Sequence, residues 1–67
     1  MYTIEDQYGD IIGSEPTVSK AMKAAENHWQ CGMVESVAQV KQRIKLLGWS
    51  TATLRVDSTI QCIIEQA

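Results

Sequence analysis

The amino-acid sequence predicts an α+β fold in which a small antiparallel sheet of about four strands carries two helices on one face, in the order β-β-α-α-β-β. Three observations lead to this prediction. Apolar and polar residues alternate near both ends of the chain, apolar residues recur at helical spacing in the middle, and turn-forming residues separate these stretches. A chain of 67 residues is expected to form a single domain, residues 1–67.

The first two strands are predicted to form a hairpin. Tyr2 and Ile4 alternate with polar residues, and the turn-rich run 6–10 follows them. Gly9 can adopt the positive φ that a tight connection needs, so residues 11–13 are expected to return as a short second strand.

A first helix is predicted over residues 17–30. Pro16 suits a first helical turn, and Ser14 or Thr17 can cap the free backbone amides there. Gly32 is expected to end the helix in a left-handed conformation. The apolar residues that share one face of this helix are Val18, Ala21, Met22, Ala25 and Trp29.

A second helix is predicted over residues 37–47. Ser36 and Gln39 form a capping-box pattern before it, and Gly48 stands at its exit. The sequence leaves open an alternative in which residues 33–40 form a strand and this helix is shorter.

Two further strands are predicted after Trp49, where the apolar period changes to two. The first is expected over residues 52–57 and the second over residues 59–65, with a turn at Asp57 and Ser58. The residues expected to be buried together in the core are Met22, Trp29, Ile44, Leu54 and Ile60.

The composition is typical of a folded, soluble protein, with 45% hydrophobic and 21% charged residues. The longest apolar run is too short to cross a bilayer, and the N-terminus lacks the basic and then apolar layout of a signal peptide. We therefore expect a cytoplasmic protein without membrane contact, located in the host cytoplasm if its source is viral. Because so short a chain buries little surface, a protein partner or a homo-oligomer is expected.

The sequence offers no assembled set of catalytic or metal-binding residues. Cys31 and Cys62 lack metal-ligand spacing and are expected to be free, buried thiols. His28 is the single histidine, and it lies at the border of the apolar face of the first helix. The carboxylates of the first hairpin are expected to be solvated turn residues that are not enclosed in a pocket. We therefore expect no enzyme activity, cofactor or metal.

The charge is unevenly distributed along the chain. Residues 1–19 hold four acids and no base, whereas residues 20–45 hold five bases and two acids. An acidic hairpin with an aromatic residue suits a basic partner surface, such as one that binds nucleic acid. Leu46 and Trp49, further along the chain, are expected to be exposed apolar contacts. The predicted partner-binding residues are Glu5, Asp6, Tyr8, Asp10, Glu15, Leu46 and Trp49.

A local motif indicates an alternative. Residues 47–50, followed by Thr53, Leu54 and Arg55, resemble the turn and the start of the recognition helix in helix-turn-helix proteins. This resemblance implies a small DNA-binding regulator. Two strands over residues 48–66 would favour protein binding, and a helix there would favour DNA binding. The nucleic-acid-binding residues of this alternative are Lys41, Arg43, Lys45, Ser50, Thr51, Thr53 and Arg55.

As a whole, the chain resembles small proteins of phages and mobile elements, including anti-CRISPR proteins. Its size, its acidity, the hairpin over residues 2–13 and the amphipathic helix over residues 17–29 carry the resemblance. The resemblance implies a stoichiometric, non-enzymatic inhibitor that covers a nucleic-acid-binding surface of a bacterial defence complex of the CRISPR type.

Overall fold

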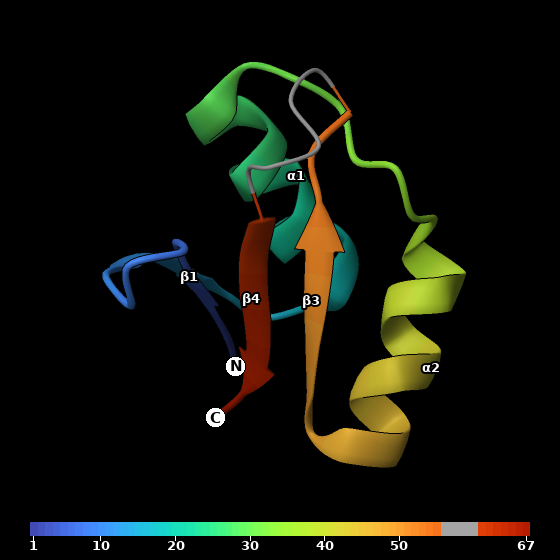
Figure 1. The fold of residues 1–67 in the computed structure, drawn as a ribbon. Helices are drawn as coiled ribbons and strands as arrows, with labels where there is room; N and C mark the ends of the chain where they lie inside the picture. The colour runs from blue at the N-terminus through green and yellow to red at the C-terminus, as the bar shows by residue number, and fades with distance from the viewer. Residues whose placement is uncertain (56–60) are drawn as a thin grey trace.

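The structure is a computed structural model that describes residues 1–55 and 61–67. Its elements, in chain order, are β1 (Tyr2–Glu5), β2 (Ile11–Glu15), α1 (Val18–Trp29), α2 (Val37–Leu47), β3 (Trp49–Thr53) and β4 (Gln61–Gln66), as Figure 1 shows. The predicted α+β class and the order β-β-α-α-β-β are therefore confirmed.

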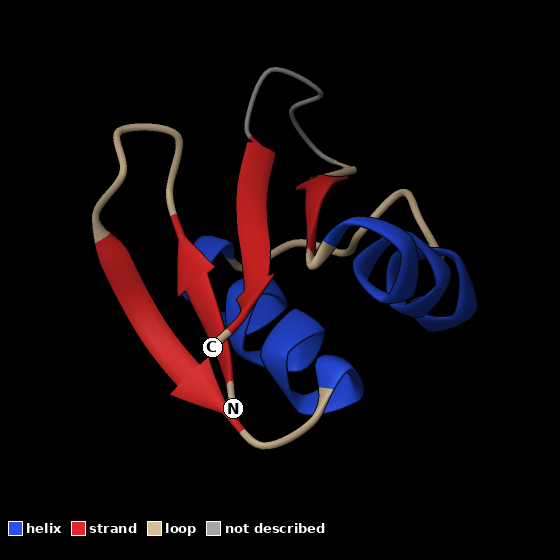
Figure 2. Cartoon of the chain, turned by 90° about the horizontal axis from the view of Figure 1, so that it is seen from below, coloured by secondary structure: helices blue, strands red, loops and turns tan. Residues whose placement is uncertain are grey.

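Within the described residues, the four strands form one antiparallel sheet in the order β2-β1-β4-β3. β1 and β4 come from opposite ends of the chain and pair in the middle of the sheet (Figure 1). Both helices lie on the same side of the sheet (Figure 2). There α1 contacts β1, β2 and β4, whereas α2 contacts β3 and β4.

The β1–β2 hairpin forms as predicted, although β2 runs two residues further than expected, to Glu15. The backbone amide of Asp6 donates to the carbonyl oxygen of Asp10 at 2.9 Å, and Gly9 has a φ of +86°. Glycine adopts this conformation without the steric cost that a Cβ would bring. A register shift between Ile4 and Glu5 marks a bulge in the pairing with β2.

Helix α1 begins where the sequence indicates but ends earlier. Thr17 is the N-cap, and its hydroxyl accepts a hydrogen bond from the amide of Lys20 at 3.1 Å. The left-handed residue at the other end is Gln30, with a φ of 55°, so the predicted cap at Gly32 is wrong. The amides of Gln30 and Cys31 both donate to the carbonyl oxygen of Glu26, which closes the helix two residues before the glycine.

Helix α2 has the predicted bounds because its caps are local. Ser36 and Gln39 form the expected capping box, with hydrogen bonds of 3.2 and 2.9 Å. Gly48 ends the helix with a φ of 83°. The alternative of a strand over residues 33–40 is wrong. The only β-pairing described in that range is an isolated bridge between Met33 and Leu54, the residue that follows β3.

Strand β3 starts at Trp49, three residues before the predicted start at Ala52. Its early start follows from pairing, because Trp49 to Thr53 match Glu65 to Gln61 residue by residue. The predicted turn at Asp57 and Ser58 lies outside the described residues.

The core lies between the sheet and the helices. Met22, Ile44 and Leu54 are buried in it as predicted, whereas Trp29 is only partly buried and packs against its edge. Ile60 falls outside the described residues. The side chains that are fully buried and largest are Ile4, Leu54, Ile64, Val40, Cys62 and Ser50.

Candidate protein-interaction face

The candidate site is the side of the sheet opposite to the two helices. Residues paired across antiparallel strands project from the same side, and successive residues of a strand alternate sides. Because Ile4, Ala52, Cys62 and Ile64 are buried on the helix side, their neighbours project from the other side. We call this side the open face; its residues are Thr3, Glu5, Ile11, Ser14, Trp49, Thr51, Thr53, Gln61, Ile63 and Glu65.

The open face combines apolar and acidic side chains. Trp49 is 45% exposed and Ile11 is 67% exposed, while Ile63 is half-buried between them. Glu65 stands directly opposite Trp49 on the neighbouring strand, and Glu5 stands opposite Ile63. None of the open-face residues is a lysine or an arginine.

The helix side carries four exposed lysines, together with the partly buried carboxylates of Glu15 and Glu26. Lys20 and Lys23 are exposed on α1, and Lys41 and Lys45 are exposed on α2. The described part of the molecule therefore has an acidic and apolar sheet side and a lysine-bearing helix side. Such a distribution gives an approaching charged partner a preferred orientation.

The hairpin tip continues the open face at the Glu5–Ile11 pair. Tyr8 is 81% exposed at this tip, and Asp10 is exposed beside it. Asp6 has a structural role, because its Oδ1 accepts hydrogen bonds from the amides of Tyr8 and Asp10, both at 2.9 Å. Three predicted contacts, Glu5, Tyr8 and Asp10, are thus brought together around a turn that Asp6 holds.

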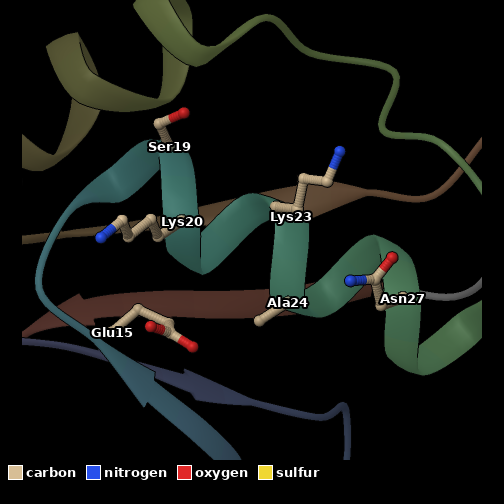
Figure 3. Close-up of a pocket in the computed structure, with 6 residues that line it drawn as sticks. All are labelled: Glu15, Ser19, Lys20, Lys23, Ala24 and Asn27. Carbon is tan, nitrogen blue, oxygen red and sulfur yellow. The ribbon is translucent and has the colours of Figure 1, made fainter.

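Glu15 lies apart from the other predicted acids. It pairs with Tyr2 at the far end of β2 and lines a hollow beside α1 with Lys20 and Lys23 (Figure 3). Glu15, one of the predicted partner-binding residues, therefore lies on a different surface from the hairpin tip. The sequence places it only ten residues from Glu5, but β2 reverses direction and carries it to the opposite end of the strand pair.

The two apolar contacts predicted from the sequence are both exposed. Leu46 is 73% exposed on α2, where it lines a shallow hollow with Glu35 and Arg43. Trp49 belongs to the open face, on a different element. Trp49 is thus the apolar contact that shares a surface with the acidic residues.

The helix-turn-helix geometry is not formed. Trp49–Thr53 is a strand, so the predicted start of a recognition helix is wrong. Small and β-branched residues alternate there, and their pairing with β4 buries every second side chain. Ser50, a nucleic-acid-binding residue of that alternative, is 2% exposed, whereas Thr51 and Thr53 lie on the open face.

Two of the basic residues of that alternative make intramolecular contacts, although Arg55 is exposed and the Arg43 side chain is 40% exposed. Arg55 donates from Nη2 to the carbonyl oxygen of Met33 at 3.0 Å. The Nη2 of Arg43 lies 4.0 Å from Oε1 of Glu35, whose Oε2 accepts the amide of Thr53 at 2.9 Å. These contacts attach residues 33–35 to the outer edge of β3, while Lys41 and Lys45 remain exposed on the helix side.

Sequence reasoning missed several members of the open face: Thr3, Ile11, Ser14, Gln61, Ile63 and Glu65. The period-two pattern separated the two sides of each strand. It did not show that the first and last strands pair, and this β1–β4 pairing is what joins Glu5 to Trp49 and Glu65 in one surface.

The described residues do not form a group of three or more His, Cys, Asp or Glu side chains that could hold a metal ion. His28 is exposed and packs edge-on against Trp29, with ring centroids 4.7 Å apart. Cys31 and Cys62 are free, and Cys62 is buried while Cys31 is half-buried. Neither described helix is long and apolar enough to cross a membrane.

Comparisons of the chain with models of protein families, with curated proteins and with solved structures find no match.

Proposed function

We propose that this chain is a non-enzymatic protein-interaction module that docks its open face on a basic surface of a partner protein. The observation that carries the proposal is the separation of charge between the two sides of the sheet. The open face holds Glu5, Glu65 and an exposed Trp49 and has no lysine or arginine, whereas four exposed lysines lie on the helices. Complementary charge steers a basic partner to this side and disfavours docking on the other.

The composition of the open face also suits a stable contact. Tryptophan is enriched among the residues that dominate binding energy, and Ile63 lies diagonally next to Trp49 on the neighbouring strand, while Ile11 adds an exposed apolar side chain on β2, beyond Glu5. A standard interface buries about 800 Å² on each partner, which is about a fifth of the 4219 Å² that this chain exposes. The open face, which all four strands form, is the surface on which we expect an interface of this area.

The proposed partner surface is one that binds nucleic acid. Surfaces of that kind carry lysines and arginines that neutralise phosphates, and they are therefore complementary to an acidic face. In this proposal the chain occupies the surface of a bacterial defence complex of the CRISPR type and blocks its nucleic acid, as the resemblance to anti-CRISPR proteins implies.

The test compares a face variant with a helix-side variant. Trp49→Ser with Glu65→Lys changes the open face, and Leu46→Ser with Lys23→Glu makes changes of the same kind on the helices. Proteins captured from a bacterial lysate by the unmodified chain are purified, and their binding to all three chains is measured by calorimetry at several salt concentrations. Melting temperatures establish that both variants fold.

We expect the face variant to lose binding and the helix-side variant to keep it. Affinity should fall as salt rises, and the partner's nucleic acid should compete with the chain. Equal binding by the face variant, or loss of binding in the helix-side variant alone, would contradict the proposal. Binding of the unmodified chain to duplex DNA with a steep salt dependence would also contradict it.

A further inference from the structure

A further hollow lies on the helix side of the molecule, away from the open face. It has a volume of about 300 Å³ and is formed where the start of α1, the middle of α2 and the ends of β1 and β4 meet. The residues that line it are Tyr2, Val18, Lys41, Ile44, Lys45 and Gln66.

Two lysines flank this hollow. Lys41 and Lys45 are one turn apart on α2, a spacing that sets Cβ atoms about 5–6 Å from each other. Both are exposed, and within residues 1–55 and 61–67 neither lies within ion-pair distance of a carboxylate. Glu65, on the last strand, projects from the opposite side of the sheet. Both lysines therefore line the hollow without an ion-pair partner among the described residues, and Glu15, opposite Tyr2 on the neighbouring strand, lines the hollow beside Lys20 and Lys23 instead.

The first turn of α1 adds hydrogen-bond donors next to the lysines. Thr17 caps the amide of Lys20, and the carbonyl oxygen of Thr17 accepts the amide of Ala21. The amides of Val18 and Ser19 precede these and have no acceptor among the described residues. Val18 itself lines the hollow, so this partly positive helix end supports the same ligand charge as the lysines.

The remaining lining is largely apolar. Val18 and Ile44 are buried beneath the hollow, and the half-buried ring of Tyr2 stands beside them. These side chains offer contacts to carbon atoms, whereas the lysine ammonium groups offer contacts to oxygens with more than one negative charge.

We propose that this hollow binds a phosphate monoester carried on an apolar group. The phosphoryl oxygens contact Lys41 and Lys45, and the apolar group packs against Tyr2, Val18 and Ile44. The hollow beside Lys20 and Lys23 has two lysines as well, but Glu15 lines it and opposes an anion there (Figure 3). The proposed site is independent of the open face and of the partner protein.

The experiment is an NMR titration of the amide resonances with phenyl phosphate at constant ionic strength. Inorganic phosphate, benzoate and sodium chloride are titrated in parallel. The test variant is Lys41→Gln with Lys45→Gln. The matched control is Lys20→Gln with Lys23→Gln, which removes the same charge from the other hollow.

We expect saturable shifts of the amides of Val18, Ser19 and Gln66. Phenyl phosphate should bind more tightly than inorganic phosphate or benzoate. The Lys41/Lys45 variant should raise the Kd for phenyl phosphate by about tenfold or more, since each charge-assisted contact contributes strongly, and the Lys20/Lys23 control should leave it within about twofold.

Four outcomes would overturn the proposal: shifts that do not saturate, shifts that chloride reproduces, benzoate binding as tightly as phenyl phosphate, or equal losses in both variants. Because the titration uses no partner protein, its result is separate from the test of the open face.

Discussion

Asp6 holds the hairpin tip through its carboxylate, and its position therefore decides how Tyr8 is presented. Oδ1 accepts two backbone hydrogen bonds, from Tyr8 and Asp10. Such side-chain turns are a common role of aspartate between two strands. Asp10 is exposed at the same tip and accepts with its backbone rather than its side chain. Two acids of one short turn thus have different roles, which composition alone does not distinguish.

Replacing Asp6 with alanine should lower the free energy of unfolding by about 1 kcal/mol, because two amides lose their acceptor at an exposed site. Asp10→Ala is the matched control and should change it by less than about 0.5 kcal/mol. Urea unfolding followed by circular dichroism measures both. Equal effects would show that the Asp6 carboxylate does not hold the turn.

Cys62 makes the stability of the protein depend on pH in the alkaline range. Burial raises the pKa of the Cys62 thiol from 9.0 to about 11, and the negative charge of Glu35 adds to the shift. The unfolded chain releases this proton at a lower pH than the folded chain. The contribution of Cys62 to stability is therefore intact below about pH 9 and is lost as the pH rises towards about 11.

We therefore expect the free energy of unfolding of the unmodified chain to fall more steeply between pH 8 and about pH 10.5 than that of Cys62→Ala. The variant has lost the thiol but keeps every other group that titrates in this range, so the difference isolates Cys62. Urea unfolding at both pH values gives the comparison. Parallel pH profiles would contradict this assignment.

Among the elements, the outer edge of β3 is protected without a fifth strand. The amide of Val34 donates to the carbonyl oxygen of Thr53 at 2.8 Å, and the amide of Arg55 donates to that of Gly32 at 2.6 Å. Between them the Glu35 carboxylate takes the amide of Thr53. Exposed strand edges can pair with other chains, and residues 32–35 cover part of the outer edge of β3.

Removing the Glu35 carboxylate should leave the amide of Thr53 without an acceptor and Arg43 without its ion-pair partner. We expect Glu35→Ala to cost about 1–3 kcal/mol of unfolding free energy, and hydrogen exchange at Thr53 should become faster. Glu65→Ala removes an exposed carboxylate and serves as the control, with an expected change below about 0.5 kcal/mol. An unchanged exchange rate at Thr53 in Glu35→Ala would refute this role.

Helix ends were predictable where the determinants are local. Ser36, Gln39 and Gly48 act within one or two turns, and the bounds of α2 followed from them. The end of α1 was not predictable in this way, because the carbonyl oxygen of Glu26 collects two amides and places the left-handed residue at Gln30. The start of β3 depends on how far its pairing with β4 extends, and the predicted turn at Asp57 and Ser58 did not show that the pairing reaches Trp49 and Glu65.

For the molecule as a whole, the candidate site arises from strand adjacency. The sequence indicated that Trp49 is exposed and that Glu5 belongs to an acidic hairpin. It indicated a turn between β3 and β4, but not that β4 also pairs with β1 and so sets Glu65 and Trp49 on the same surface as Glu5. Alternation gives the side of a strand, whereas the adjacency of β1 and β4 requires pairing between residues from opposite ends of the chain. Glu15 is the reverse case, because it is close to the hairpin acids in the sequence but lies on another surface in the structure.

A chain that ends at residue 60 should not fold, because β4 provides hydrogen bonds to both β1 and β3 and buries Cys62 and Ile64. A chain that ends at residue 66 loses only the hydrogen bond from Ala67 to Met1 and should keep its secondary structure. Circular dichroism and the dispersion of amide resonances measure the difference. A cooperative melting transition in the shorter chain would contradict the central role of β4.

The position of β4 in the middle of the sheet also sets the order of events during synthesis. Every other described element is made before residues 61–66, yet the first strand can acquire its second neighbour only when these residues emerge from the ribosome. Until then, Ile4 and Ala52 lack the strand that joins them. Folding is therefore completed after translation of β4, and the nascent chain presents unpaired strand edges that a chaperone or protease can recognise until that moment.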